Sequence, residues 1–306
     1  MQNPEIAAKL GISITTVSKA LKNYSDVSPK TKAAVIDLAK QLNFTPNNFA
    51  LYLKSNESKT IGLIIPEIVH HFFGNVVSGV VQTATSMGYL VIVLQSNESV
   101  ELEKQYVNLL INKRVDGILI SLSNESNAEN HLKEILNKKI PLVQFDKICK
   151  MIPSSKILID DQQAAFNAVE HLILKGCRVI AHVRGPTNPQ NSIDRFLGYK
   201  KALEHYAIPY NPELVFTCTN VLYEEGIKFA KEIFSHHKNI DGIFVITDLV
   251  ALGVLNGLLE LGVDIPNQVK IIGFSNWFIS SISKPKLSTI NQPGFEMGVQ
   301  AVNLLL

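Results

Sequence analysis

Polar side chains that follow apolar runs are the groups in this sequence best suited to bind a ligand. The candidates are Asp146, Arg195, Thr247, Asp248, Ser275, Trp277 and Gln292. An aspartate and an arginine on facing surfaces can hold a polyol through charge-assisted hydrogen bonds, and an indole ring can stack on the apolar face of a sugar. These residue types predict a site for a small hydroxylated molecule.

Some of these residues have an equally good structural explanation. An isolated aspartate after a strand is often a turn or a helix cap, and Asp248 is as well explained by capping the helix that follows it. Trp277 also suits a core or a dimer surface. The adjacent His70 and His71 resemble a metal pair, but neighbouring histidines point apart and no carboxylate follows at ligand spacing. A solvated cleft lip is expected there, and no metal.

A second group of hydrogen-bonding residues lies near the N-terminus. Asn3 can cap a first helix with Pro4 at its first position, Gly11 permits the turn that ends it, and Ser13 can cap a second helix. A third amphipathic helix over residues 30–42 completes a core that two short helices cannot form alone. The segment predicts a helix-turn-helix, whose second helix enters the major groove of DNA.

The outward face of the second helix would present Ile14, Thr15 and Lys19 to DNA. Lys19 can donate to guanine acceptors, whereas Ile14 offers only apolar contact, for example to a thymine methyl group. Short hydroxyls suited to phosphate oxygens stand at Ser13, Thr16, Ser18, Ser28 and Thr31. Helix capping explains Ser13 and Ser28 equally well.

The distribution of charge supports contact with nucleic acid. Residues 1–59 hold eight lysines and four acidic residues, a net charge of +4, so the other 247 residues carry −2 within the overall +2. Phosphate contact needs such local positive charge. The alternative, a small three-helix domain that binds no nucleic acid, leaves this asymmetry unexplained.

From Lys59 onward, apolar runs alternate with amphipathic stretches, a pattern typical of βαβ units and a parallel sheet. The predicted strands are 61–65, 90–94, 117–120, 142–145, 157–159, 179–183, 214–217, 242–246, 270–274 and 288–290. The helices expected between them include 72–87, 100–112, 162–174 and 249–261. Because residues 113–120 resemble 238–245 in the same strand position of each half, we expect two lobes with a ligand cleft at the carboxyl ends of their strands.

Several short stretches occur in a characteristic order along the whole chain. They are Ile6-Ala7, Thr16-Val17-Ser18-Lys19-Ala20-Leu21, Val27-Ser28-Pro29-Lys30-Thr31, Leu42-Asn43-Phe44-Thr45-Pro46-Asn47, Ala50 with Leu53, and Thr60-Ile61-Gly62-Leu63-Ile64-Ile65-Pro66. In this order and spacing they resemble the lactose-repressor (LacI/GalR) family of bacterial transcription regulators.

The resemblance implies an α/β fold with three parts. These are a helix-turn-helix head at 1–46, a hinge helix and linker at 47–59, and a two-lobed, doubly wound effector-binding and dimerisation domain at 60–306 that resembles periplasmic binding proteins. The lobes are expected at about 60–159 and 160–290. The chain stops at Leu306 within an apolar helical pattern and opens at its first helix, so both ends look shortened.

The resemblance also implies roles for individual residues. It places Ile14, Thr15 and Lys19 at base-reading positions, and Asn47, Ala50 and Leu53 in or beside a hinge helix that inserts a leucine into the minor groove. The family often has an arginine after the hinge alanine, where this chain has Leu51. The alternative, packing of the hinge leucines on the effector domain, is disfavoured by the polar run at 54–59.

For the cleft, the resemblance places Asp146, Arg195, Thr247, Ser275 and Gln292 at effector positions. Phe72 and Phe73 match the aromatic lip of the family's cleft, although burial of one of them in the core is as good an explanation. The family commonly has an aspartate where this chain has Ser275, so the ligand can differ from a simple hexose.

The sequence therefore predicts a cytoplasmic, sequence-specific repressor. It would bind double-stranded operator DNA as a homodimer, under control of a small molecule, expected to be a sugar, held between the lobes. The alternatives are a stand-alone sugar-binding protein and an α/β enzyme, but no nucleophile elbow, phosphate loop or paired metal motif is present. No cofactor is expected.

The remaining features set limits on the class of protein. No run of about 18 apolar residues and no signal peptide is present, which predicts no membrane segment and no export. The cysteines Cys149, Cys177 and Cys218 fit no metal or CxxC spacing, so reduced thiols are expected.

Overall fold

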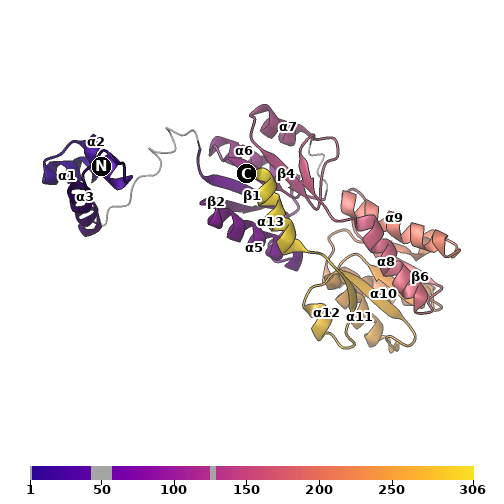
Figure 1. The fold of residues 1–306 in the computed structure, drawn as a ribbon. Helices are drawn as coiled ribbons and strands as arrows, with labels where there is room; N and C mark the ends of the chain where they lie inside the picture. Colours follow the sequence, from indigo (N-terminus) through magenta and orange to yellow (C-terminus); the bar gives the residue numbers. More distant parts are fainter. Residues whose placement is uncertain (1, 43–56, 125–128) are drawn as a thin grey trace. The chain divides into compact units, whose positions relative to one another are not determined.

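The computed structural model describes residues 2–42, 57–124 and 129–306, and the chain forms two compact units, Met1–Asn56 and Glu57–Leu306 (Figure 1). Each unit has an apolar core of its own. The predicted hinge helix lies outside the described residues, and so do Asn47, Ala50 and Leu53.

The N-terminal unit contains three helices, α1 (Gln2–Leu10), α2 (Ile14–Leu21) and α3 (Pro29–Gln41). They pack around the fully buried side chains of Ile6, Val17 and Val35. As predicted, Ser13 and Ser28 are N-caps: their hydroxyls accept hydrogen bonds from the backbone N–H of Thr16 at 3.0 Å and of Thr31 at 3.1 Å. The helix-turn-helix is thus held by local capping and one shared core.

The start of the first helix differs from the prediction. Helix α1 begins at Gln2, so Asn3 lies inside the helix and is not its cap. Pro4 is then the third helical residue. This position is tolerated because the first N–H groups of a helix have no intrahelical acceptor, so the missing proton of Pro4 breaks no hydrogen bond.

The second unit contains two lobes, each built on one five-stranded parallel sheet. Lobe 1 has the strand order β2-β1-β3-β4-β5 and lobe 2 the order β7-β6-β8-β9-β10, so the two sheets share one doubly wound topology. The strands of lobe 1 are β1 (Thr60–Ile65), β2 (Leu90–Gln95), β3 (Gly117–Ile120), β4 (Leu142–Phe145) and β5 (Ser155–Ile157). Those of lobe 2 are β6 (Ile180–Arg184), β7 (Val215–Thr217), β8 (Gly242–Val245), β9 (Lys270–Ser275) and β10 (Ser288–Asn291). The repeated segment of the sequence corresponds to β3 and β8, which occupy the same central position in each sheet.

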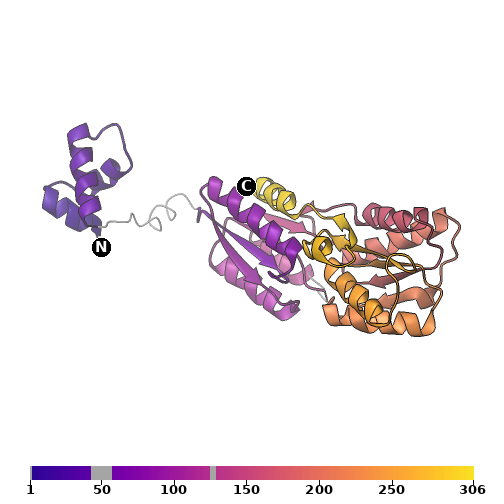
Figure 2. The ribbon, with the colours of Figure 1, turned by 90° about the horizontal axis from the view of Figure 1, so that it is seen from below.

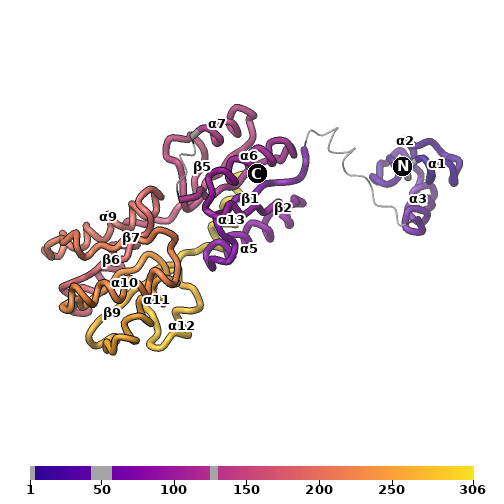
Figure 3. The backbone as a smooth tube through the Cα atoms, turned by 180° about the vertical axis from the view of Figure 1, so that it is seen from behind, coloured from indigo at the N-terminus to yellow at the C-terminus, as the bar shows by residue number. Residues whose placement is uncertain are grey.

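Helices cover both faces of each sheet (Figures 1 and 3). In lobe 1 they are α5 (His71–Ser86) and α13 (Gly294–Leu305) on one face, and α6 (Val100–Asn112) and α7 (Glu129–Asn137) on the other. In lobe 2 they are α8 (Asp161–Leu174) and α9 (Gln190–His205) on one face, and α10 (Tyr223–His236) and α11 (Asp248–Glu260) on the other. Two short elements, η1 (Pro212–Leu214) and α12 (Ile279–Ile282), complete lobe 2. The inner strands of the two sheets are buried on both faces, which explains their continuous apolar runs; they are β1, β3, β4, β6, β8 and β9.

Helix α13 returns to lobe 1 after the chain has completed lobe 2, and it packs beside α5 (Figure 2). The approach is close enough to require glycine: a Cβ added at Gly79 would lie 2.2 Å from the Phe295 carbonyl oxygen, and one at Gly298 would lie 2.3 Å from that of Val76. The described chain therefore crosses between the lobes after β5 and again after β10.

The bounds of several predicted strands differ from those observed. The predicted strand 157–159 is observed as β5 at Ser155–Ile157, because the chain leaves the sheet at the half-exposed Leu158 for the crossing to α8. Leu214, predicted as strand, ends η1, where the Asn211 side chain accepts from the N–H of Glu213. None of the described helices is long and apolar enough to cross a membrane.

Candidate functional site

A cleft of about 970 Å³, open solvent at its mouth included, lies between the lobes at the carboxyl ends of their strands. Lobe 1 contributes the loops after β1, β2, β3 and β4, and lobe 2 contributes the loops after β6, β7, β8 and β9 together with the start of α9. Eight of the nine residues predicted to bind an effector line it: Phe72, Phe73, Asp146, Arg195, Thr247, Ser275, Trp277 and Gln292.

Arg195 lies on α9 and is held in a fixed orientation in the wall of the cleft. Its Nε donates to Asp161 Oδ1 at 2.7 Å, its Nη1 donates to the Ile246 carbonyl at 3.0 Å, and its guanidinium lies 3.7 Å from the centre of the Phe274 ring. Burial raises the pKa of Asp161 to about 6, although the nearby Arg195 opposes this shift. The arginine is thus positioned before any ligand arrives.

Asp146 connects the two lobes. It directly follows β4 in lobe 1, and its Oδ1 accepts a hydrogen bond of 3.0 Å from Nδ2 of Asn191 at the start of α9 in lobe 2. The backbone of Asp146 adopts a positive φ of 57°, a conformation that most residues avoid. This geometry turns the carboxylate toward the opposite lobe.

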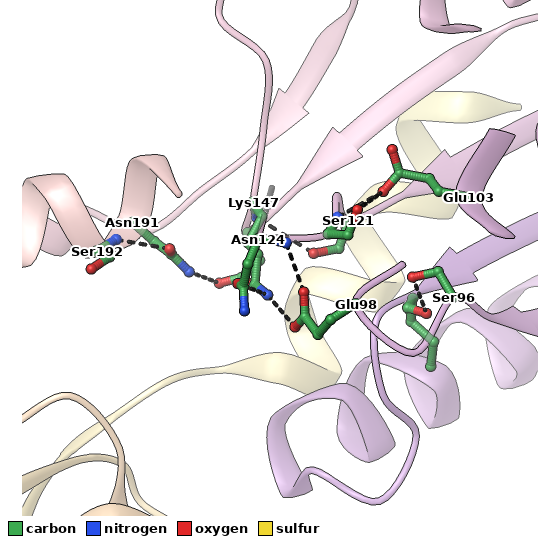
Figure 4. A network of polar contacts seen from close by, with 11 residues as sticks. Ser96, Glu98, Glu103, Ser121, Asn124, Lys147, Asn191 and Ser192 are labelled. Carbon is green, nitrogen blue, oxygen red and sulfur yellow. Dashed lines mark hydrogen bonds and ion pairs between the residues drawn. The ribbon is translucent and has the colours of Figure 1, made fainter. Parts of the chain in front are cut away.

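A charged group of three residues on lobe 1, which was not predicted, forms another part of the wall. The Lys147 ammonium contacts Glu98 Oε1 at 2.5 Å and Asn124 Oδ1 at 2.6 Å, and the Asn124 N–H donates to Glu98 Oε2 at 2.7 Å (Figure 4). These residues follow β4, β2 and β3 respectively. Like Asp146, these three residues are polar side chains that follow apolar runs of the sequence. The sequence therefore did contain a signal for them.

Aromatic rings from both lobes form the lip of the cleft. The Trp277 indole stacks on the His71 ring with 6.2 Å between centroids and 9° between planes, and it lies 6.0 Å from the His70 ring. Phe72 and Phe73 are both buried in the core of lobe 1, and both also line the cleft. The two explanations given for them, core packing and a place at the cleft, therefore hold together. Burial lowers the pKa of His70 to about 4, which leaves its ring neutral at neutral pH.

Within the described part of the chain, three buried polar atoms in the cleft wall have no hydrogen-bond partner. They are the hydroxyls of Ser192 and Ser275 and the Nδ1 atom of His70. Ser192 was not predicted as a site residue, because a serine inside a helix carries no distinctive sequence signal. His70 was expected at a solvated cleft lip; it lines the cleft, but its Nδ1 atom is buried. A buried polar group without a partner destabilises the free protein, so these atoms mark where a ligand can bind.

Asp248 is the predicted site residue that does not line the cleft. It is almost fully buried as the first residue of α11, which Thr247 caps. Its carboxylate accepts hydrogen bonds from the Trp277 N–H at 2.7 Å and the Thr289 hydroxyl at 2.6 Å. Asp248 therefore supports the loop that carries Ser275 and Trp277 from behind. Burial raises its pKa to about 6.

In the N-terminal unit, the predicted DNA-contacting residues lie at the surface. Ile14 has 51% of its surface exposed, and Thr15 is also exposed. The half-exposed Lys19 forms an ion pair with Asp26. Hydroxyls occupy the surface around them in two bonded pairs, Ser13 with Thr16 and Ser28 with Thr31, and Ser18 is half-buried.

Comparison with known proteins identifies both units. Residues 58–306 match the family of periplasmic binding proteins and the sugar binding domain of the LacI family, and residues 4–47 match the bacterial regulatory proteins of the lacI family. Catabolite control protein A of Priestia megaterium is 32% identical over 98% of this chain and 90% of its own length. The transcriptional regulator RegA of Clostridium acetobutylicum is 35% identical over 99% of this chain and 90% of its own.

Among solved structures, the Lac repressor dimer bound to operator and the anti-inducer ONPF has the same fold, with a TM-score of 0.88 at 24% identity over 98% of this chain and 90% of that one. The relatives are transcriptional regulators and not enzymes, in agreement with the prediction. The chain therefore belongs to the LacI family, as a DNA-binding transcriptional regulator that joins a helix-turn-helix unit to a two-lobed effector domain of the sugar-binding type.

Proposed function

We propose that this protein is a cytoplasmic repressor that binds a near-palindromic operator as a homodimer and changes its operator affinity when a sugar binds between the lobes. The observation that carries the proposal is the cleft, where side chains of both lobes meet and buried polar atoms have no partner in the described structure. A ligand that contacts both lobes stabilises one relative position of the lobes over others, and this preference can be coupled to DNA binding.

The roles of the DNA-contacting residues are part of this proposal. Lys19 and Thr15 would read bases, and Ile14 would contact a thymine methyl group. The hydroxyls of Ser13, Thr16, Ser18, Ser28 and Thr31 would contact phosphates, which set the register but carry no sequence information. Asn47 and Ala50 would contact DNA near the hinge, and Leu53 would enter the minor groove.

The test is operator selection with the full chain. DNA fragments retained from a random library should share a near-palindromic site, which the protein should bind at least a thousandfold more tightly than bulk duplex, a ratio typical of specific binding. Lys19→Ala should relax the preference at one base position, whereas Leu53→Ala should weaken all sites. Lys22→Ala, which removes the same charge from an exposed position just after α2, serves as the control. Binding that shows only the salt dependence of bulk duplex would instead indicate a stand-alone ligand-binding protein.

A further inference from the structure

The unpartnered atoms of the cleft define what a ligand must offer. Ser192 and Ser275 are each 3% exposed, and in the described structure neither hydroxyl has a hydrogen-bond partner. Each can donate one hydrogen bond and accept others. The third atom, His70 Nδ1, belongs to a ring that burial keeps neutral, since it lowers the pKa of His70 to about 4. All three groups are uncharged, and a ligand hydroxyl can satisfy each of them.

The cations of the cleft, in contrast, already face carboxylates. Arg195 contacts Asp161, and Lys147 contacts Glu98. The carboxylate of Asp146 accepts from Asn191 and keeps its second oxygen for a donor from the ligand. An acidic ligand would have to compete with these internal carboxylates for both cations.

The sum of charges also opposes an acidic ligand. The two cations of the cleft, Lys147 and Arg195, are outnumbered by the carboxylates of Glu67, Glu98 and Asp146 on its lining together with Asp161 behind Arg195. Glu67 lies exposed at the rim, while Asp146 and Asp161 are buried. Excess negative charge in a partly dehydrated cleft repels an anion more strongly than it would in water.

We propose that the effector of this cleft is an uncharged polyhydroxy compound whose hydroxyls bind Ser192 and Ser275, and that the cleft excludes the acidic and phosphorylated forms of the same compound. The inference rests on the proposed function only in taking this cleft as the effector site. Trp277 and Phe73 supply apolar surface for the carbon face of such a compound, and the carboxylate of Asp146 accepts from its hydroxyls.

The experiment begins with a thermal-shift screen of the full chain against uncharged monosaccharides, disaccharides and sugar alcohols. A compound that binds the folded protein raises its melting temperature. Each compound that does so is then compared by calorimetry with its uronic acid and its phosphate ester. We expect each of these two acidic derivatives to bind at least tenfold more weakly than the uncharged compound. Equal or tighter binding of either acidic derivative overturns the proposal, and so does the absence of a shift with every uncharged compound.

Two serine variants test the predicted contacts. Ser275→Ala and Ser192→Ala should each weaken binding of the uncharged compound about tenfold, while the melting temperature of the free protein stays constant or rises, because each change removes an unsatisfied buried oxygen. Ser96→Ala, at a fully buried serine outside the cleft lining whose hydroxyl donates to the Ile65 carbonyl, is the control and should not change binding. A lower melting temperature with unchanged affinity would show that the two cleft serines are merely structural, and this overturns the proposal.

A charge variant completes the test. Glu98→Gln removes the carboxylate that pairs with Lys147. The ratio between the affinities for the uncharged compound and for its acidic derivative should therefore fall severalfold. An unchanged ratio contradicts the electrostatic part of the proposal. Operator binding is measured in parallel, so the two proposals fail separately: loss of operator binding with sugar binding intact refutes only the proposed function, and an anionic effector on a functional repressor refutes only this inference.

Discussion

Asn191 and Asp146 belong to different lobes, and one hydrogen bond of 3.0 Å joins them across the cleft. Asn191 stands at the start of α9, and Asp146 follows β4. Lobe closure therefore has a specific contact, placed at the residues that also line the ligand site. Because such a contact forms only when the lobes are close together, its strength helps to set how readily the cleft opens.

Asn191→Ala should weaken effector binding about tenfold, since a hydrogen bond to a carboxylate contributes roughly 1.5 kcal/mol and this one favours the closed cleft. Calorimetry with the sugar found in the screen measures the change, and small-angle scattering should show a larger mean radius. Asn167→Ala on the exposed side of α8 is the control, with only the bond from Gln163 lost. Equal affinities for the two variants would show that the contact between the lobes is unimportant.

Trp277 should report ligand binding by its own fluorescence. It is the single tryptophan of the sequence, and it stacks on His71 of the opposite lobe at the cleft lip. Effector binding should change the intensity or the wavelength of emission, and His71→Ala should change the emission of the free protein because the stacked ring is lost. Trp277→Phe removes the signal and serves as the blank. A spectrum that is insensitive to a ligand proven by calorimetry would contradict the placement of Trp277 at the site.

Asp248 should make stability depend on pH. Burial raises its pKa from 3.8 to about 6, so between about pH 4 and pH 6 the folded chain holds a proton that the unfolded chain has released. Its contribution to the free energy of unfolding is therefore fully present at low pH and is lost as the pH rises through about 6.

The comparison with Asp248→Asn isolates this contribution, because Asp161 and His70 titrate equally in both proteins. The advantage of the wild type over Asp248→Asn in urea unfolding should be about 2 kcal/mol larger at about pH 4.5 than at pH 7. A constant difference across this range would mean that the Asp248 carboxyl titrates as it does in water.

Asp26→Asn should increase DNA affinity severalfold. The ion pair with Asp26 competes for Lys19, and an exposed ion pair contributes little to stability, so the lysine is released at little cost. Asp37→Asn, which removes the same charge from an exposed position on α3, is the matched control. Fluorescence anisotropy over a range of salt concentrations should show a larger increase in operator affinity for Asp26→Asn than for Asp37→Asn. The same increase for both variants would mean that the change in net charge alone explains the effect.

Gly79→Ala should destabilise the protein by about 2 kcal/mol, as in other overpacked cores, because the added methyl group would lie 2.2 Å from a backbone oxygen of α13. Gly74→Ala in the same helix meets its nearest atom at 3.8 Å and should be neutral or slightly stabilising, since alanine favours helix. Thermal unfolding of both variants tests the contact. If the two changes have the same effect, α13 does not lie against α5 as described.

Much of the fold could be predicted from the sequence because its signals are local. The strands at Gly117–Ile120 and Leu142–Phe145 agree with the prediction, since buried parallel strands are short apolar runs whatever lies next to them. Capping by Ser13 and Ser28 depends on residues only three positions away, so it could be predicted as well. The same locality explains why Asp146 and Ser275, as residues at strand ends, were expected to line the cleft.

What the sequence determined by itself was therefore the order of elements, the two-lobed α/β plan, the helix-turn-helix and the set of strand-end residues from which the cleft is built. Only the tertiary structure decided that Asp248 faces away from the cleft, that α13 returns to lobe 1, and that Asn191 bonds to Asp146. The reason is physical. Apolar periodicity and capping act over a few residues, whereas these contacts join segments tens to hundreds of positions apart, and their geometry is set by how whole helices and sheets pack.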